Sequence, residues 1–376
     1  MNYRNFGTTG WKASALGFGA MRLPVTGQDH HIDEPLAIAM IRRAIDAGVN
    51  YLDTAYGYHD KQSEVLVGKA LRDGYRERVK LATKMPMWLV KETADFDRLF
   101  DEQLGKLQTD HVDLYLLHAI NKAGWDKAAG LGAREWLLRQ HERGRIGWIG
   151  FSFHGEAQDF PQIVDAWDRW DFCQIQYNYM DEEIQAGTKG LRHAAARKIA
   201  VVVMEPLQGG NLVSPPPAVS AVWDSMPLRR SPADWGLQWV WDQPEVSVVL
   251  SGMSTMEQVE QNVRSAERSG VGSLSPLERT HIHEAAETYR GLRPIPCTQC
   301  NYCMPCPHGV EIPHNLGIWN RRVMYNNLEG AKIGYHQWTK PEQRASECTA
   351  CLECEEKCPQ KIVIHEWMEC IAKELA

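Results

Sequence analysis

Short apolar runs alternate with amphipathic stretches between residue 15 and about residue 268. Eight runs have the length and the β-branched composition of strands, and they span residues 15–21, 50–55, 79–84, 112–118, 146–152, 172–178, 200–206 and 247–252. Runs such as VDLYLL and AVVVM are nearly all apolar, as parallel strands are when helices cover both faces of their sheet. The pattern therefore predicts a parallel α/β fold.

The stretches between these runs carry apolar residues at helical spacing, which predicts amphipathic helices. In the first stretch, Pro35 stands near the start and Gly48 follows the end, where a first-turn proline and a C-cap glycine belong. Its apolar stripe consists of Leu36, Ala37, Met40, Ile41, Ala44 and Ile45. Further helices are expected near residues 64–73, 95–107, 131–143, 156–168, 186–198, 232–242 and 256–267.

Eight evenly spaced β–α units predict a (β/α)8 TIM barrel, because a doubly wound sheet seldom repeats the unit so often. Before the first unit, Tyr3–Phe6 and Trp11–Ser14 flank Gly-Thr-Thr-Gly, which predicts a β-hairpin that could plug one end of the barrel. Residues 213–230 break the rhythm and are expected to form a long loop, and residues 274–290 a further helix. Arg293–Pro296 makes a stiff boundary, so we expect a barrel domain at residues 1–290 and a second domain at residues 291–376.

The composition narrows the classes of partner. Apolar residues make up 44% of the chain and charged residues 24%, and the net charge is −7. Neither expected domain is basic, which argues against nucleic acid as a partner. The N-terminal MNYRNFGTTGWKAS lacks the apolar core of a secretory signal, and no apolar run approaches the roughly 20 residues of a membrane span. We therefore expect a cytoplasmic protein.

Nine of the ten cysteines lie in residues 297–376, and Cys173 is the exception. In a reducing compartment such clustering indicates metal binding rather than disulfides. The first run comprises Cys297, Cys300, Cys303 and Cys306, and the second comprises Cys348, Cys351, Cys354 and Cys358. A proline follows each run directly.

The second run has the C-x2-C-x2-C-x3-C-P spacing of bacterial [4Fe–4S] ferredoxins, in which the fourth cysteine ligates the other cluster. This rule assigns Cys297, Cys300, Cys303 and Cys358 to one cluster, and Cys348, Cys351, Cys354 and Cys306 to the other. The first run departs from the rule, because two residues instead of three precede its last cysteine. Structural zinc is the alternative, but zinc sites use separated pairs of ligands. The 41 residues between the runs are partly helical in pattern, so we expect a small, mainly helical ferredoxin-like domain with two [4Fe–4S] clusters.

Three consecutive strands end in ionisable residues, at the edge where TIM-barrel active sites lie. The second strand ends at Asp53, with Tyr58 five residues on; the third ends at Lys84 and the fourth at His118. The phenol of a free tyrosine titrates near pH 10, and a nearby ammonium favours its phenolate, so we expect Lys84 to make Tyr58 a better proton donor. Asp53 would keep Lys84 charged, and His118 would orient a carbonyl oxygen. Trp88 and Trp125, which follow the third and fourth strands, are candidates for a substrate pocket.

In order and position, Asp53, Tyr58, Lys84 and His118 resemble the catalytic tetrad of the aldo-keto reductase family, and the whole chain resembles a subgroup with a C-terminal ferredoxin-type domain. The resemblance implies NADP(H) or NAD(H) as cofactor and a small carbonyl or alcohol as substrate. It also implies a set of nucleotide-contacting residues: Gly19, Met21, Ser152, Gln174, Leu207, Gly209, Ser254, Gln258 and Asn262.

Three positions depart from the family pattern. Phe153 replaces an asparagine that contacts the nicotinamide amide, and Met204 replaces an aromatic residue that stacks on the ring. Residues 253–256 contain no Arg or Lys for the 2′-phosphate of NADPH, which leaves the choice between NADPH and NADH open.

These features predict an oxidoreductase that transfers hydride between NAD(P)H and a carbonyl or alcohol, and that exchanges electrons through its clusters with a redox partner such as a ferredoxin or a flavoprotein. Two alternatives stay open. The barrel is a scaffold for an electron-transfer protein, or the clusters drive a reduction without nicotinamide. The first hypothesis has one difficulty, since hydride carries two electrons, a cluster carries one, and no flavin motif is evident.

Overall fold

A computed structural model describes residues 1–27 and 31–376 of the chain. Its residues form two compact units. The first unit comprises residues 1–209 and 234–276, and the second comprises residues 210–233 and 277–376. The second unit thus includes a segment from the middle of the sequence. The expected boundary between residues 290 and 291 stays a prediction.

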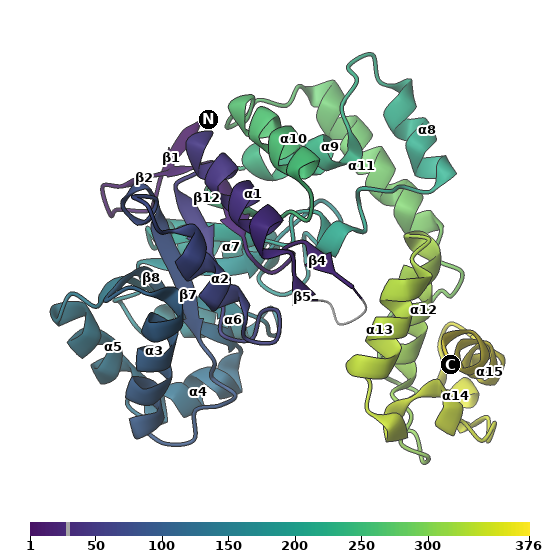
Figure 1. The fold of residues 1–376 in the computed structure, drawn as a ribbon. Helices are drawn as coiled ribbons and strands as arrows, with labels where there is room; N and C mark the ends of the chain where they lie inside the picture. The colour runs from purple at the N-terminus through teal and green to yellow at the C-terminus, as the bar shows by residue number, and fades with distance from the viewer. Residues whose placement is uncertain (28–30) are drawn as a thin grey trace. The chain divides into compact units, whose positions relative to one another are not determined.

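The first unit, drawn in purple to green in Figure 1, contains a closed parallel barrel. Its described strands follow the order β3-β6-β7-β8-β9-β10-β11-β12, and β12 pairs with β3. All eight strands predicted from the apolar runs are present. Their bounds are β3 (Leu16–Gly19), β6 (Tyr51–Asp53), β7 (Lys80–Met85), β8 (Val112–Ile120), β9 (Ile146–Phe153), β10 (Phe172–Gln176), β11 (Ala200–Met204) and β12 (Val246–Gly252). The predicted TIM barrel is confirmed.

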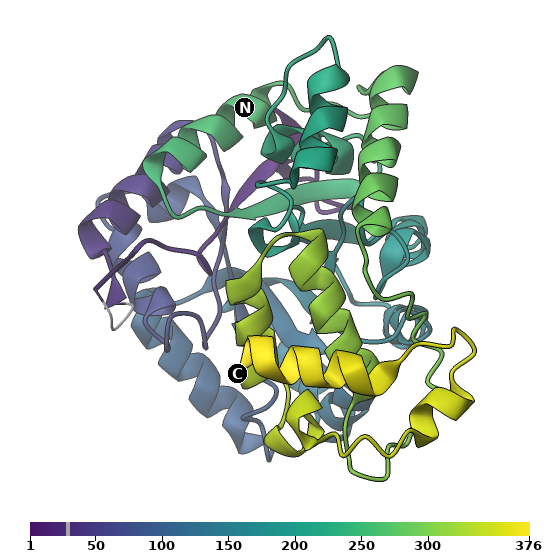
Figure 2. The ribbon, with the colours of Figure 1, turned by 90° about the vertical axis from the view of Figure 1, so that its right-hand side faces the viewer.

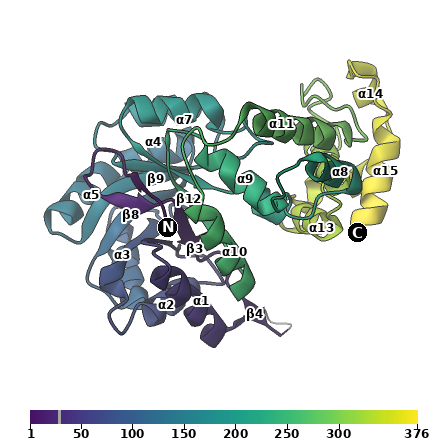
Figure 3. The same ribbon diagram turned by 90° about the horizontal axis from the view of Figure 1, so that it is seen from above.

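Helices surround the strands of this unit, as the view from above shows (Figure 3). Helix α1 illustrates the local causes: Asp33 accepts a hydrogen bond from the Leu36 amide, Pro35 lies in the first turn, and Gly48 has φ 97° after the last turn. The barrel helices are α1 (Glu34–Asp46), α2 (Ser63–Ala70), α3 (Ala94–Leu107), α4 (Lys122–Gly130), α5 (Ala133–Glu142), α6 (Asp159–Asp165), α7 (Gly187–Ala196), α9 (Pro232–Trp241) and α10 (Met256–Glu267). Helix α4 was not predicted.

The predicted hairpin of β1 (Tyr3–Asn5) and β2 (Lys12–Ser14) is present and closes the end of the barrel at which the strands begin. Phe6 is fully buried, with its ring centroid 5.6 Å from that of Phe172 in the first position of β10. Trp11 stacks on Trp148 at 5.4 Å. A second short hairpin pairs β4 (Val25–Thr26) with β5 (His31–Ile32). Because aromatic side chains fill the N-terminal end, the C-terminal ends of the strands are left for chemistry.

The second unit is mainly helical around its own apolar core, which includes Ile312, Leu316, Tyr335, Met368 and Ile371. Helices α12 and α13 run side by side and α15 crosses them (Figure 2). The helices of this unit are α8 (Pro217–Ser225), α11 (Pro276–Gly291), α12 (Ile312–Met324), α13 (Leu328–Gln337), α14 (Glu353–Lys357) and α15 (Ile364–Leu375). None of the helices in the described ranges is long and apolar enough to cross a membrane.

The expectation that residues 213–230 form a plain loop is wrong. This segment contains α8, which has Pro217 in its first turn and buries Val219 and Trp223. Proline has no amide hydrogen to lose at a first helical position, so the proline-rich start suits a helix N-terminus. The helix predicted at residues 274–290 is present as α11.

Candidate active site and iron–sulfur sites

Lys84 lies at the centre of the candidate active site. Its Nζ donates hydrogen bonds to Asp53 Oδ1 at 2.6 Å and to the Thr54 carbonyl at 2.9 Å, and it lies 3.4 Å from the Tyr58 hydroxyl. Lys84 is 1% exposed and Asp53 is 2% exposed, so the ion pair is almost completely removed from water. The two residues come from neighbouring strands, β6 and β7, and both lie near the strands' C-terminal ends.

Tyr58 reaches this pair from the loop between β6 and α2. The next three residues, His59, Asp60 and Lys61, all have positive φ between 48° and 71°, a conformation that costs energy for residues with a side chain. His59 Nε2 accepts a hydrogen bond from the Leu23 amide, which ties this turn to the segment after β3. The strained turn is therefore fixed at its first residue, directly after Tyr58.

The sequence led us to expect that Lys84 lowers the pKa of Tyr58, but the net shift is upward. Burial raises the pKa of Tyr58, and the opposing effect of Lys84 does not overcome it. Burial also lowers the pKa of Lys84, but Asp53 and Tyr58 outweigh this and the net shift is upward, so Lys84 stays an ammonium. Burial raises the pKa of Asp53, against the effect of Lys84. Tyr58 is therefore a protonated donor at neutral pH whose phenolate, once formed, lies beside a fixed positive charge.

His118 completes the set at the end of β8. Its ring lies 6.1 Å from the Tyr58 ring and 5.1 Å from that of Trp88, which is 54% exposed. Burial, then Lys84 and His154, lower the pKa of His118 well below its usual range, so its imidazole is neutral. Trp125 does not share this environment, because it is buried on α4 and packs on Trp170. His154 was missed by the sequence analysis, since no motif marks it.

A buried network behind Lys84 was also missed. Glu64 is fully buried, and its Oε1 accepts hydrogen bonds from the Thr83 hydroxyl and from Gln103 Nε2, both at 2.7 Å. Gln103 Nε2 also donates to the Lys84 carbonyl at 2.9 Å, and Gln103 Oε1 accepts from the Tyr115 hydroxyl at 2.6 Å. The network fixes the main chain that carries the lysine.

The residues expected to hold the nicotinamide are buried at neighbouring strand ends. Ser152 Oγ accepts a hydrogen bond from the Ala119 amide, which leaves its hydroxyl hydrogen to donate. Gln174 is 2% exposed, and its Oε1 lacks a hydrogen-bond partner among the residues that the structure describes. Gly19 pairs with Asp53 at the end of β3, and Met21 is 54% exposed just beyond it.

Two of the residues expected at the phosphate and adenosine end, Gly209 and Ser254, lie against Arg22, which the sequence analysis missed. One guanidinium nitrogen of Arg22 lies 3.6 Å from the point where a side chain on Gly209 would begin. Ser254 Oγ donates to the Arg22 carbonyl at 2.8 Å, and the Ser254 amide donates to Gln258 Oε1 at 2.7 Å. Leu207 lies two residues before Gly209, and Asn262 Nδ2 donates to Ser251. Arg22 thus offers a cation where residues 253–256 have none.

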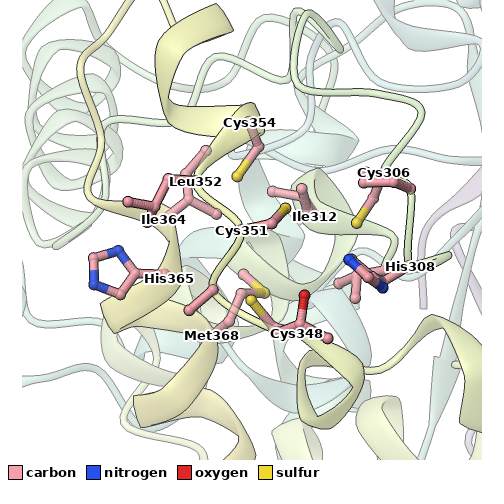
Figure 4. Close-up of a pocket in the computed structure, with 14 residues that line it drawn as sticks. Cys306, His308, Ile312, Cys348, Cys351, Leu352, Cys354, Ile364, His365 and Met368 are labelled. Carbon is pink, nitrogen blue, oxygen red and sulfur yellow. The ribbon is translucent and has the colours of Figure 1, made fainter.

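In the second unit, four cysteines from both runs line one pocket, and Figure 4 shows their sulfur atoms around a common space. They are Cys306, Cys348, Cys351 and Cys354. A second pocket is lined by Cys297, Cys300, Cys303 and Cys358. The structure thus groups the cysteines as the exchange of fourth ligands requires, and cluster binding by these residues stays a prediction. Cys370 lines neither pocket.

A (β/α)8 barrel with this site, joined to an iron–sulfur domain, defines an oxidoreductase. The chain belongs to the aldo/keto reductase family, whose model matches residues 15–216. Residues 296–363 match the model of a 4Fe-4S dicluster domain. The resemblance stated from the sequence is therefore confirmed.

Two curated relatives share part of the sequence. Aldo-keto reductase YhdN of Bacillus subtilis is 38% identical over 223 residues, which cover 56% of this chain and 64% of that protein. The chain thus spans less than two thirds of that relative's length. L-galactose dehydrogenase of Arabidopsis thaliana is 28% identical over 283 residues, which cover 69% of this chain and 86% of that protein.

Solved structures share the barrel. The holo form of aldo-keto reductase AKR11C1 from Bacillus halodurans is 26% identical with a TM-score of 0.64, and the match covers 77% of this chain and 97% of that one. An aldo-keto reductase from Klebsiella pneumoniae, solved in complex with NADPH, is 23% identical with a TM-score of 0.61 over 76% of this chain and 95% of that one. The latter likeness supports the fold alone.

Proposed function

We propose that the chain catalyses reversible hydride transfer between NAD(P)H and a small carbonyl or alcohol, with Tyr58 as general acid and base, and that it also transfers electrons through two [4Fe–4S] clusters. The observation that carries the first part is the buried Asp53–Lys84 pair, whose ammonium lies 3.4 Å from the Tyr58 hydroxyl. A structural ion pair alone does not require a tyrosine hydroxyl at this position.

Each of the four residues of the candidate active site has a separate role in carbonyl reduction. NAD(P)H, when bound, supplies the hydride to the carbonyl carbon. Tyr58 gives its proton to the carbonyl oxygen and is left as a phenolate, which the Lys84 ammonium stabilises. Asp53 keeps Lys84 protonated, and the neutral His118 donates a hydrogen bond that orients the carbonyl. In the reverse direction Tyr58 takes the proton from the alcohol.

Support for a nicotinamide comes from polar side-chain atoms at the strand ends that can still form hydrogen bonds to a ligand. The unpartnered Gln174 Oε1 in the described structure suits the amide hydrogens of a nicotinamide, and the Ser152 hydroxyl can donate to its oxygen. Arg22 would bind phosphate oxygens beside the Leu207–Gly209 loop. Phe153 is fully buried, with its ring 5.1 Å from the Phe160 ring, so it packs in the core and leaves one family contact unreplaced.

The proposed cluster sites rest on donor chemistry. Each pocket brings together four thiols, the number that a [4Fe–4S] cluster needs. Cys351 and Cys300 are exposed, which suits electron exchange with an outside redox partner. A ferredoxin or a flavoprotein is the partner class that we propose, because a flavin accepts two electrons and releases them singly.

The Tyr58→Phe variant tests the barrel chemistry. It should lower carbonyl reduction by about 10²–10⁴-fold, the usual value of a general acid, without changing cluster absorbance. Tyr56→Phe is the matched control, since the Tyr56 hydroxyl donates to the Glu102 carboxylate on α3, at 3.0 and 3.1 Å, in the described part of the chain. Activity that survives Tyr58→Phe would show that another group supplies the proton.

Nucleotide titration separates this function from its alternatives. The holoprotein, purified without oxygen, is titrated with NADH and with NADPH while Trp fluorescence is recorded. Saturable quenching is expected for at least one nucleotide. If neither nucleotide binds, the hydride mechanism is excluded, and a cluster-driven reductase or a barrel scaffold becomes the better account.

A further inference from the structure

The two cysteine runs form loops with the same backbone. Each loop has the sequence Cys-Thr-x-Cys-x-x-Cys, in the first loop at residues 297–303 and in the second at residues 348–354. At the third and fifth positions φ is positive in both loops, with values of 57° and 62° in the first and 55° and 67° in the second. These positions are held by Gln299 and Asn301 in the first loop and by Ala350 and Leu352 in the second. Because positive φ is uncommon outside glycine, its recurrence at matching positions shows that one loop conformation is used twice.

The matching positions also line matching pockets. The Cys297 pocket is the one that contains Cys297 and Cys358, and the Cys348 pocket is the one that contains Cys348 and Cys306. The second, third and fifth residues of each loop line the pocket of that loop. Ile364 is 1% exposed and lines both pockets, so the two sites are neighbours. The two loops therefore present the same backbone to two adjacent sites.

The side chains at these matching positions differ in chemistry. The first loop has Gln299 and Asn301, whose amide groups can donate hydrogen bonds. The second loop has Ala350 and Leu352, which have no donor in their side chains. Figure 4 shows Leu352 among the residues that line the Cys348 pocket. One pocket thus has a polar lining where the other has an apolar one.

The charges near the two pockets differ in the same direction. The sixth position holds Tyr302 in the first loop and Glu353 in the second, and of these side chains the glutamate is the one ionised at neutral pH. Lys357 lies 4.0 Å from Glu353, but both side chains are at least half exposed, so the pairing is weak. Lys357 also directly precedes the last cysteine of the Cys297 pocket. His365 lines the Cys348 pocket, but its Nδ1 lies 2.7 Å from Glu355 Oε1, and in neither protonation state of the histidine does this pair have a net positive charge.

These differences act on the reduction of a bound cluster. A cluster takes up one electron, which adds one negative charge and breaks no bond. Hydrogen bonds to the cluster sulfurs and positive neighbours stabilise the added charge, whereas negative neighbours and an apolar lining disfavour it. The amides of the first loop and the carboxylate of the second therefore both make the Cys297 pocket the easier site to reduce.

We propose that the two [4Fe–4S] clusters are reduced in sequence, the one in the Cys297 pocket first, and that Gln299, Asn301 and Glu353 set this order. The proposal rests on the two cluster sites proposed above. In each step the redox partner loses the one electron that the cluster gains. An electron that enters at the Cys348 pocket passes to its neighbour, so the chain takes up two electrons singly and not as a pair.

A redox titration of the holoprotein, followed by EPR spectroscopy, measures the order. The anaerobic protein is reduced stepwise with dithionite and redox mediators at about pH 8, where free histidines are neutral. Two one-electron steps are expected, and their equilibrium constants should differ at least about tenfold, which is about 59 mV. A single hydrogen bond to a charged group is worth about this factor.

Exchanges between the loops assign each step to a pocket. Asn301→Leu gives the first loop the residue of the second, and it should lower the equilibrium constant of the first step about tenfold. Leu352→Asn is the reverse exchange and should raise that of the second step about tenfold; asparagine tolerates positive φ better than leucine, so this variant should fold. Glu353→Gln should raise the second step by less, because its carboxylate is exposed. Glu329→Gln, exposed on α13 and outside both pockets, is the control and should change neither step.

Iron content separates failure of this inference from failure of the cluster sites. Iron and acid-labile sulfide for fewer than two clusters would mean that the proposed cluster binding is wrong, and this inference with it. Two clusters reduced in a single step would overturn the inference alone. It would also be overturned if Leu352→Asn moved the first step, since the Cys348 pocket would then be reduced first. If Asn301→Leu loses its clusters, Leu352→Asn still decides, and a second step that it leaves unchanged would contradict the assigned cause.

Discussion

The Asp53→Asn substitution tests the central ion pair most directly. It keeps the size of the side chain and removes the negative charge 2.6 Å from Lys84 Nζ. Lys84 would then be a buried ammonium whose remaining close contacts are the Thr54 carbonyl and the Tyr58 hydroxyl. Because Asp53 raises the pKa of Lys84 against burial, its loss should lower that pKa.

The size of the effect follows from distance and burial. Two unit charges at the observed 2.6 Å attract by about 6 kcal/mol at an effective dielectric of about 20. Desolvation offsets much of this while the pair is intact, but removal of one partner leaves the other charge uncompensated. The expected loss of stability is therefore about 3–5 kcal/mol. Carbonyl reduction should fall by about 10²-fold or more, since Lys84, without Asp53 to hold it in place and charged, stabilises the phenolate less.

Urea unfolding of the holoprotein, followed by Trp fluorescence, measures the loss, with kcat/KM measured in parallel. Asp46→Asn is the matched control, because Asp46 pairs with Arg78 at 2.7 Å with both side chains nearly half exposed. It should cost no more than about 1 kcal/mol. Lys84→Met combined with Asp53→Asn should cost less than the sum of the two single changes. Equal costs for Asp53→Asn and Asp46→Asn would refute the reasoning.

Three further predictions concern the rest of the chain. Arg22→Gln should raise the Kd of the dinucleotide about tenfold, as measured by fluorescence, because a phosphate contact is lost. Arg43→Gln is the control and should leave this Kd unchanged, because Arg43 is exposed and pairs with Glu260. Cys358→Ser should lower iron and acid-labile sulfide by about half, since one cluster loses a ligand, whereas Cys370→Ser should leave both at full content. His118 has a lower pKa in the folded protein than the value of 6.5 expected in the unfolded chain. The free energy of unfolding should therefore decrease as the pH falls below 6.5 towards the folded-state pKa. The pH profile of kcat/KM should show no inflection from this residue between about pH 6 and 8.

The barrel could be predicted because its strands are apolar at almost every position, and the eight expected runs all overlap observed strands. Helices α4 and α8 could not be predicted from the sequence. The sequence of α4, KAGWDKAAG, contains two glycines and only two residues that become buried, Trp125 and Ala128. The prolines before α8 indicate a break in the chain, and nothing in the sequence tells a break from the start of a helix.

The candidate site, too, could be predicted only in part from the sequence. Asp53, Lys84 and His118 could be found because they stand at the ends of predicted strands. The upward shift in the pKa of Tyr58 depends on burial, which the sequence does not give. Arg22 was missed because a cation was sought within residues 253–256, whereas the structure brings one from the segment after β3. Such neighbours arise from barrel closure and leave no local pattern.

The division of the chain into units has a consequence for synthesis of the protein. Residues 210–233 belong to the second unit, yet they leave the ribosome before residues 234–276, which complete the barrel. Helix α8, in which Trp223 is buried, is therefore synthesised before the rest of its unit, which begins at residue 277. Domains usually fold in order from the N-terminus, so the last steps of barrel folding take place around a tethered apolar segment. The iron–sulfur unit is thus interlaced with the reductase in the order of synthesis, because its first segment is made before the barrel is complete.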